Sequence, residues 1–406
     1  MIGFDPYSPE FVEDPYPVFE RLRAESPVFF DERWGVTFFA RHQDVRGILR
    51  DRRFGRDVRH AVDASEIDQA AFDRIYPVQY PNWVRYIRES FIDFEPPAHT
   101  RLRRLVQFAF SRRASESYRS RLESTAERLL DQALDKGTME AVAEYATPIP
   151  LAMISDLMGI PAEDQHQLVD WSAAIVRLYD QACTPEEGAL GESATIEFVD
   201  YVRTLIDRRA NTPGEDLVTA LIEAEVDGDR LGEDEVIATA ILTLNAGHAA
   251  TVQAIGNGIM ALARYPDQHE LLRREPDLIH QAVDELLRYD TPLQMFERWV
   301  LEDLEWNGVP LRRGTKVGLL FGSANRDELA FEEPARLDLA RTPNDHVSFG
   351  GGIHHCVGAP LARVEMEVAF SHFARRVREF EVQIESPPRV PSLVFRGVRE
   401  LPLKLA

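Results

Sequence analysis

Residues 349–358 read FGGGIHHCVG, and the helical pattern APLARVEMEVAFSHFARRV follows at once. Three successive glycines allow backbone conformations closed to other residues and let the chain approach a flat ligand closely. Cys356 stands just before the helix, where the helix dipole and free N–H groups favour a thiolate and lower the thiol pKa. The segment taken alone therefore allows two interpretations of Cys356, a metal-ligating thiolate and the more common small buried thiol.

Zinc bound by this segment is a second alternative. His354, His355 and Cys356 would supply three ligands, whereas structural zinc needs a fourth, usually from a second pair. The other cysteine, Cys183, is isolated in the sequence. Adjacent ligands also fit tetrahedral geometry poorly, so zinc is the weaker interpretation.

Composition limits the classes of function. The 406 residues carry a formal net charge of -22, which disfavours nucleic acid as a partner. Two distant cysteines suit a reducing compartment, and the N-terminus resembles neither a signal peptide nor a membrane anchor, so we expect a cytoplasmic protein. Length alone favours two or three domains. Without repeats or a low-complexity linker, however, we expect residues 1–406 to form one large domain.

The hydrophobic pattern predicts a mainly α protein with small β-sheets. Residues 15–50 read as helix, strand pair and helix, and helical patterns dominate residues 97–298. Short strands with turns at Asn307-Gly308 and Arg313-Gly314 follow, and the C-terminal 26 residues read as strands. Residues 236–263 contain no Asp, Glu, Lys or Arg. Their many polar residues favour a long buried helix over a membrane span.

An irregular stretch at residues 59–92 is rich in aromatic residues. A loop of this length in a compact domain is often functional. Tyr76, Tyr80 and Trp83 line a pocket in one interpretation and pack the loop against the core in the other.

The decapeptide at 349–358 resembles the haem-binding signature of the cytochrome P450 family, F-G-x-G-x-H-x-C-x-G, at each specified position. The resemblance is to the soluble bacterial-type haem-thiolate monooxygenases. It implies haem b (iron protoporphyrin IX) with Cys356 as the axial thiolate. It also places His354 near a haem propionate and Phe349 near the sulfur, and implies a long central helix over the haem.

Other segments resemble the same family in the expected order. In FEPPAHTRLRRLVQFAF, His99 and Arg103 share a helix face, and the resemblance implies that both contact a propionate. The family usually has Asp where Glu95 stands. Arg298 corresponds to the residue that holds the other propionate. The pair Glu285 and Arg288, in ELLR, corresponds to a buried structural ion pair. Taken alone, each of these residues would read as an ordinary surface group.

Two turns and the central helix are implied to surround the substrate. By resemblance, the substrate pocket consists of Leu293, Met295, Phe296, Leu393, Val394 and Ala246. Taken alone, Leu393 and Val394 are ordinary strand residues that pack on a core.

The central helix departs from the family at its catalytic motif. Many bacterial members have an acid–alcohol pair that relays protons during oxygen activation, and Ala249 and Ala250 stand at those positions. General acid catalysis needs a donor within hydrogen-bond reach, directly or through one water. Thr251 or His248 acting through water, a polar group of the substrate, and peroxide or otherwise atypical chemistry remain open. His248 otherwise fills space as a structural residue.

The resemblance implies an oxidoreductase that inserts one oxygen atom of dioxygen into a small or medium organic substrate. Electrons would come from a ferredoxin and its reductase. Arg101, Arg104, Arg112 and Arg113 would steer that acidic partner, or else form a solvated helix face. The alternatives are a peroxide-driven or otherwise atypical oxidation, and a non-catalytic haem-binding protein.

Overall fold

Helices make up most of the molecule, in a computed structural model that describes residues 4–59, 61–180, 182–226 and 228–406. The helices are α1 (Pro9–Glu13), α2 (Tyr16–Glu25), α3 (His42–Ile48), α4 (Gln69–Ile75), α5 (Pro81–Trp83), α6 (Ala98–Val106), α7 (Arg112–Glu116), α8 (Arg119–Lys136), α9 (Pro148–Met158), α10 (Gln165–Arg177), α11 (Pro185–Asn211), α12 (Leu217–Glu223), α13 (Glu233–Arg264), α14 (Pro266–Arg274), α15 (Ile279–Tyr289), α16 (Phe321–Ala324) and α17 (Ala359–Arg376). The strands are β1 (Val28–Asp31), β2 (Val36–Phe39), β3 (Phe54–Gly55), β4 (Thr138–Glu140), β5 (Glu225–Val226), β6 (Asp229–Arg230), β7 (Met295–Val300), β8 (Leu304–Trp306), β9 (Val309–Leu311), β10 (Lys316–Leu320), β11 (Phe380–Val382) and β12 (Pro402–Leu405).

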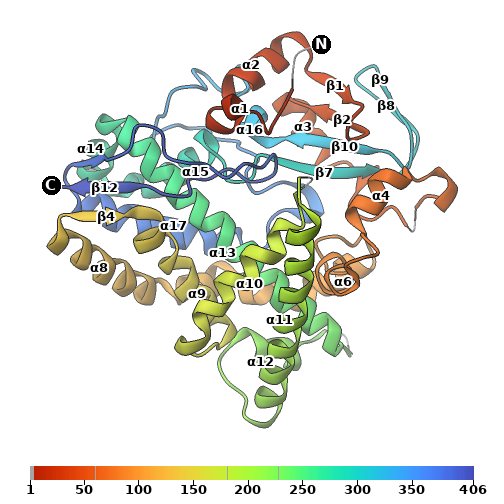
Figure 1. The fold of residues 1–406 in the computed structure, drawn as a ribbon, viewed down its shortest axis with the longest axis horizontal. Coiled ribbons are helices and arrows are strands. Elements are labelled where there is room, and N and C mark those ends of the chain that lie inside the picture. Colours follow the sequence, from red (N-terminus) through yellow and green to blue (C-terminus); the bar gives the residue numbers. More distant parts are fainter. Residues whose placement is uncertain (1–3, 60, 181, 227) are drawn as a thin grey trace.

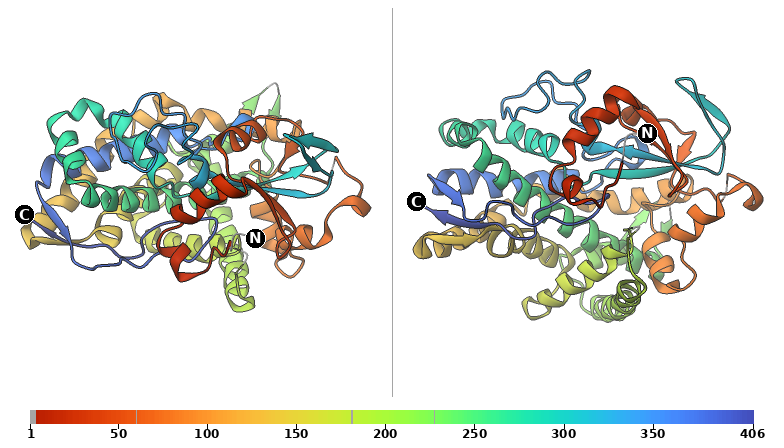
Figure 2. Two further views of the ribbon diagram at one scale, coloured as in Figure 1. Left: turned by 90° about the horizontal axis from the view of Figure 1, so that it is seen from above. Right: turned by 45° about the horizontal axis from the view of Figure 1, so that its top comes forward.

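The largest sheet joins three strands near the N-terminus to two strands between residues 295 and 320. Its strand order is β1-β2-β10-β7-β3, in which β2 and β10 are parallel and the other neighbours are antiparallel. A smaller sheet, β11-β12-β4, lies with the C-terminus at the opposite end of the long axis (Figures 1 and 2). The mainly helical fold with small sheets confirms the predicted fold class.

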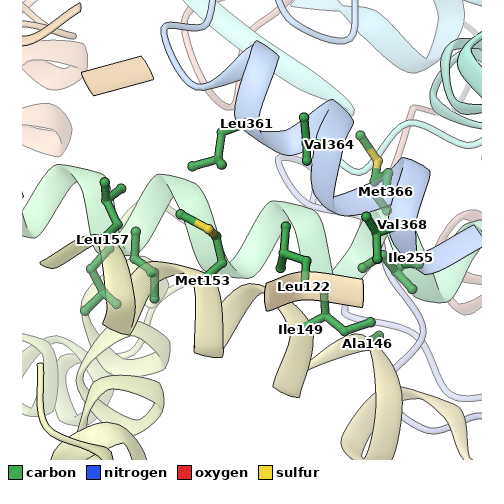
Figure 3. Packing of buried hydrophobic residues seen from close by; sticks show 14 of the residues in the cluster. Leu122, Ala146, Ile149, Met153, Leu157, Ile255, Leu361, Val364, Met366 and Val368 are labelled. Atoms are coloured by element: carbon green, nitrogen blue, oxygen red, sulfur yellow. The ribbon is translucent and has the colours of Figure 1, made fainter. Parts of the chain in front are cut away.

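Helix α13 passes through the middle of the molecule and organises the main core (Figure 1). Helices α9, α10, α11 and α17 all pack against it. Figure 3 shows Met153 and Leu157 of α9 and Val364 of α17 close to α13, which contributes Ile255. At Gly258 a Cβ would overlap the ring of Phe370, so glycine permits the contact between α13 and α17. Two packed elements thereby fix the position of the segment that follows Cys356.

The long uncharged helix was predicted correctly. It was expected within residues 236–263, and α13 runs from Glu233 to Arg264, with three acidic residues in its first turn that favour the helix N-terminus. No helix in the described part of the chain is both long and apolar enough to span a membrane. The segment is uncharged because protein surrounds most of it.

The strand predictions were partly wrong. The Asn307-Gly308 turn joins β8 and β9, and both residues have positive φ (48° and 84°), as the predicted hairpin requires. By contrast, the C-terminal 26 residues form strands mainly at β11 and β12, because the proline-rich stretch between them cannot donate the hydrogen bonds of a regular ladder. Residues 59–92 also contain α4, which Asp68 caps, although they were expected to be irregular.

Glu285 and Arg288 form an ion pair whose side chains have no exposed surface. Arg288 Nε donates to Glu285 Oε2 (2.7 Å), and Nη2 donates to Oε1 (2.8 Å). The same guanidinium donates to the carbonyls of Asn325 and Pro334 (both 2.9 Å). The pair therefore fastens α15 to the loop that leads to the cysteine segment.

Candidate functional site

The cysteine loop folds back on itself before α17 begins. The N–H of Cys356 donates to the carbonyl of Phe349 (2.9 Å), which closes the loop. Gly352 has a φ of 65°, and a Cβ there would overlap the carbonyl oxygen of Leu49. Glycine therefore lets the loop adopt a left-handed conformation in direct contact with the end of α3. Arg363 lies over the Phe349 ring, 4.5 Å from its centroid.

The thiol of Cys356 has exposed surface, yet protein surrounds it closely enough to dominate its electrostatics. Burial raises the pKa of the thiol, while the N–H groups of Gly358 and Ala359 and the guanidinium of Arg103 lower it. The lowered pKa that the sequence predicted is therefore wrong for this structure. The helix-terminal N–H groups act in the predicted direction, but desolvation outweighs them.

Basic side chains gather around Glu95 beside this loop. His354 Nε2 lies 3.2 Å from Glu95 Oε1, and the rings of His99 and His354 are 4.6 Å apart. Arg103 Nη2 donates to the carbonyl of His355 (2.7 Å). Both ring nitrogens of His99 are buried without a hydrogen-bond partner, and burial lowers its pKa to about 4. Such a cluster offers unused donors to an anion.

Arg298, on β7, is a second arginine near Glu95, in addition to Arg103. It is buried, and its Nη1 donates to the carbonyl of Glu297 (2.9 Å). Burial lowers its pKa to about 9, and repulsion from Arg56 adds to that effect, while Glu95 opposes it. A buried guanidinium with a lowered pKa is one that a carboxylate ligand would stabilise.

Helix α13 turns a face of small side chains outward at the predicted catalytic motif. Ala246 is exposed and Ala249 and Ala250 are half-buried, whereas residues 236–245 and 254–262 of the same helix are buried. At 3.6 residues per turn these positions share one face. His248 lies on the opposite face and Thr251 well away from the three alanines, and both are buried.

Neither predicted proton donor reaches the alanine face. The hydroxyl of Thr251 donates to the carbonyl of Gly247, one turn back in the same helix (3.0 Å). Burial lowers the pKa of His248 to about 4, so its imidazole is neutral at pH 7, and its Nε2 has no hydrogen-bond partner. The hydrophobic pattern alone did not distinguish these two faces.

A cavity of about 650 Å³ lies between β7, the α4–α5 region and the segment that joins α10 to α11. Met295, Phe296 and Val394 line it, as predicted for substrate contacts. The other predicted pocket residues are not part of its lining: Leu293, Leu393 and Ala246. Leu393 is instead buried and packs in a small core with Met295. Cys356 is not among the residues that line this cavity.

The aromatic residues of 59–92 divide between the two interpretations. Tyr80 lines the cavity. Trp83 has no exposed surface and its Nε1 donates to the carbonyl of Ile175 (3.3 Å), so it belongs to the core. Tyr76 is buried against Phe72.

Sequence reasoning missed three cations of this cavity: Arg56, Arg88 and Lys316. Each comes from a different segment and reads as a surface residue in isolation. The zinc alternative gains no support, since the described residues contain no group of three or more His, Cys, Asp or Glu side chains placed to hold a metal ion.

Comparisons with known proteins agree with this geometry. The family model described as Cytochrome P450 matches residues 68–398. The polyketide biosynthesis cytochrome P450 PksS of Bacillus subtilis is 35% identical over 99% of this chain and 98% of its own length. The 6-deoxyerythronolide B hydroxylase of Saccharopolyspora erythraea is 34% identical over 98% of each chain. The structure of P450BioI, solved in complex with hexadec-9Z-enoic acid ligated acyl carrier protein, has a TM-score of 0.90 and 32% identity, covering 98% of this chain and 99% of its own.

The chain therefore belongs to the cytochrome P450 family. It is an oxidoreductase of the monooxygenase class, and the family implies a haem-thiolate cofactor. The alternative of a non-catalytic haem-binding protein is set aside.

Proposed function

We propose that this protein is a haem-thiolate monooxygenase that inserts one oxygen atom of dioxygen into a small or medium-sized organic substrate. The observation that carries the proposal is the closed loop from Phe349 to Cys356 at the start of α17. A bound haem would supply the oxygen-activating chemistry, whereas the protein provides the ligand, the pocket and the access of protons. We also propose that residues 1–406 form a single domain.

We propose haem b, iron protoporphyrin IX, as the cofactor, held through the sulfur of Cys356. The residues present fit it, because the unpartnered ring nitrogens of His99 and the buried guanidinium of Arg298 suit anionic propionates. Arg103 and His354 would complete the set of donors. An anion among these groups would favour their protonated forms and so reverse the lowering of their pKa values by burial.

The ligand assignment has a direct test. Cys356→Ala should abolish the carbon monoxide difference band that is characteristic of thiolate-ligated haem. Cys183→Ala serves as the matched control and should keep the band, because Cys183 is the other cysteine and lines the 650 Å³ cavity rather than the loop at the start of α17. Retention of the band in Cys356→Ala would contradict the assignment.

We propose that protons reach the reaction through water or through a polar group of the substrate. The small side chains at Ala249 and Ala250 leave room for ordered water, while His248 and Thr251 lie on other faces of α13. The same alanine pair favours a second candidate, a peroxide-driven oxygenase, because hydrogen peroxide already carries the two protons that dioxygen would need from a relay.

Turnover separates these two candidates once a substrate has been found by a screen for ligand-induced spectral shifts. NADH with a surrogate ferredoxin and its reductase should drive the first reaction. Hydrogen peroxide alone, at comparable rate and without NADH, would instead establish the second.

We propose a ferredoxin-type electron donor that docks beside the cysteine loop. Arg112 and Arg113 are exposed on α7, which packs against α17. Arg101 was predicted to belong to the same basic cluster. It forms ion pairs with Asp229 and Glu235 instead, so we leave it out of the proposed docking surface.

The docking proposal predicts a salt-dependent effect. The double variant Arg112→Glu/Arg113→Glu should slow reduction by an acidic ferredoxin about tenfold at low ionic strength and much less at high ionic strength. Arg21→Glu, which changes an exposed arginine of α2, is the matched control, and the ferredoxin should reduce this variant at the wild-type rate. Equal rates in both variants would refute the docking surface.

A further inference from the structure

A buried cluster of charges forms one wall of the 650 Å³ cavity. Its cations are Arg56, Arg88 and Lys316, and its anions are Asp93 and Glu297. Asp93 pairs with Arg56 and also with Arg88, whose Nη1 lies 3.2 Å from Asp93 Oδ2. Lys316 pairs with Glu297, and Arg56 Nη1 donates to the carbonyl of Glu297 (2.8 Å). Arg56 and Arg88 share Asp93, so three cations against two carboxylates leave the cluster with a net charge of +1.

The other charged groups around the cavity form no ion pair with this cluster. Asp73 and Arg74 are exposed and of opposite sign, so water screens them. Asp180 lies on the facing wall, where the hydroxyl of Tyr7 donates to it (2.8 Å), and Arg177 pairs with both Asp180 (3.4 Å) and Glu187 (2.8 Å). The positive excess therefore lies on the wall of Arg56, Arg88 and Lys316, whereas the facing wall carries an excess of the opposite sign.

Several observations show that this wall is crowded with cations. The Nε atoms of Arg56 and Arg88 are buried without a hydrogen-bond partner. Burial lowers the pKa of Lys316 to about 8, and the neighbouring Arg56 and Arg88 contribute to that effect even though Glu297 opposes it. The two guanidinium groups also lie over aromatic rings, with Arg56 4.2 Å from the centroid of Phe296. Such cation–π contacts attract but carry no compensating charge.

We propose that this cavity binds the carboxylate end of an amphipathic organic acid, with Arg56, Arg88 and Lys316 as the recognition groups. A carboxylate there would neutralise the surplus and accept charge-assisted hydrogen bonds. The volume lies in the usual range for a small-molecule site. Met295 and Val394 supply apolar surface for the body of the substrate. This inference rests on the proposed monooxygenase function and names the substrate class.

The test compares two probes of equal chain length, dodecanoate and dodecan-1-ol, by isothermal titration of the haem-loaded enzyme. Wild-type protein should bind dodecanoate about tenfold more tightly than the alcohol. Glu297→Gln raises the surplus to two charges and should tighten dodecanoate binding severalfold while leaving dodecan-1-ol unchanged. Lys316→Met removes the surplus and should weaken dodecanoate binding about tenfold.

The double variant Lys316→Met/Glu297→Gln guards against misfolding, because it removes both partners of one ion pair and restores a surplus of one. It should return dodecanoate affinity to near the wild-type value. Equal affinity for both probes in the wild type, or weaker dodecanoate binding in Glu297→Gln, would overturn the proposal. The carbon monoxide band and the turnover of another substrate report on the monooxygenase function separately, so the two failures are distinguishable.

Discussion

Removing the charge of Glu285 should destabilise the whole protein. Both side chains of the Glu285–Arg288 pair have no exposed surface, and Glu285 also accepts from Arg341 Nε (3.1 Å), Asp338 N (3.0 Å) and Asn344 Nδ2 (3.2 Å). Glu285→Gln keeps the shape but leaves buried guanidinium groups without a counter-charge. Breaking a buried pair in this way costs about 3–5 kcal/mol. That loss is a large share of the free energy of unfolding, which is about 5–15 kcal/mol for a typical protein.

The measurement is urea unfolding followed by tryptophan fluorescence, with thermal unfolding followed by circular dichroism. For a chain of this length the melting temperature should fall by about 4–6 °C. Asp200→Asn is the matched control, because Asp200 and Arg203 form an i,i+3 pair with side chains that are 68% and 42% exposed. Removal of that exposed pair should cost less than about 1 kcal/mol. Equal losses in the two variants would refute the argument from burial.

Three further predictions concern α17 and α13. Burial raises the pKa of Glu365 from 4.5 to about 8, so it stabilises the fold as a neutral acid at low pH and loses that contribution as the pH rises through about 8. Relative to Glu365→Gln, the wild-type free energy of unfolding should fall by about 1.4 kcal/mol per pH unit between pH 5 and 7.5. Urea titrations over this pH range measure the difference, and parallel curves for the two proteins would contradict the prediction. Gly258→Ala should cost about 1–3 kcal/mol in the same assay, because the new Cβ overlaps the ring of Phe370, and Phe370→Leu should recover part of the loss; an unchanged midpoint would show that the ring moves freely. Ala250→Thr should raise the ratio of oxidised substrate formed to NADH consumed and lower the amount of hydrogen peroxide released. An unchanged ratio would mean that protons are delivered through other groups.

The elements that sequence predicted best were those with a strong local signal. Helix α13 was placed within three residues at each end because charges are absent from the buried segment and return at its ends. The β8–β9 hairpin followed from Asn307-Gly308, since few other pairs accept two positive φ angles. The loop around Cys356 was found because several constrained residues stand within ten positions.

The remaining features depend on packing between distant segments. Arg56 and Lys316 are ordinary charged residues in the sequence, but their side chains are only 9% and 4% exposed, because distant segments pack together around them. The pKa of the Cys356 thiol was predicted in the wrong direction because desolvation by surrounding elements is not a local property. For the same reason, the sequence alone could not predict that the His248 side chain would be buried on the face of α13 opposite the three alanines.

The alanine face of α13 has a consequence for how this enzyme can diversify. Ala246, Ala249 and Ala250 lie on the face of α13 that neighbouring helices cover least, so larger side chains at these three positions would meet a bound molecule before they displaced core neighbours. Mutations at these positions would change the shape of the space around a bound substrate with little loss of folding stability. Evolution could therefore alter the substrate range through these positions without changing the fold.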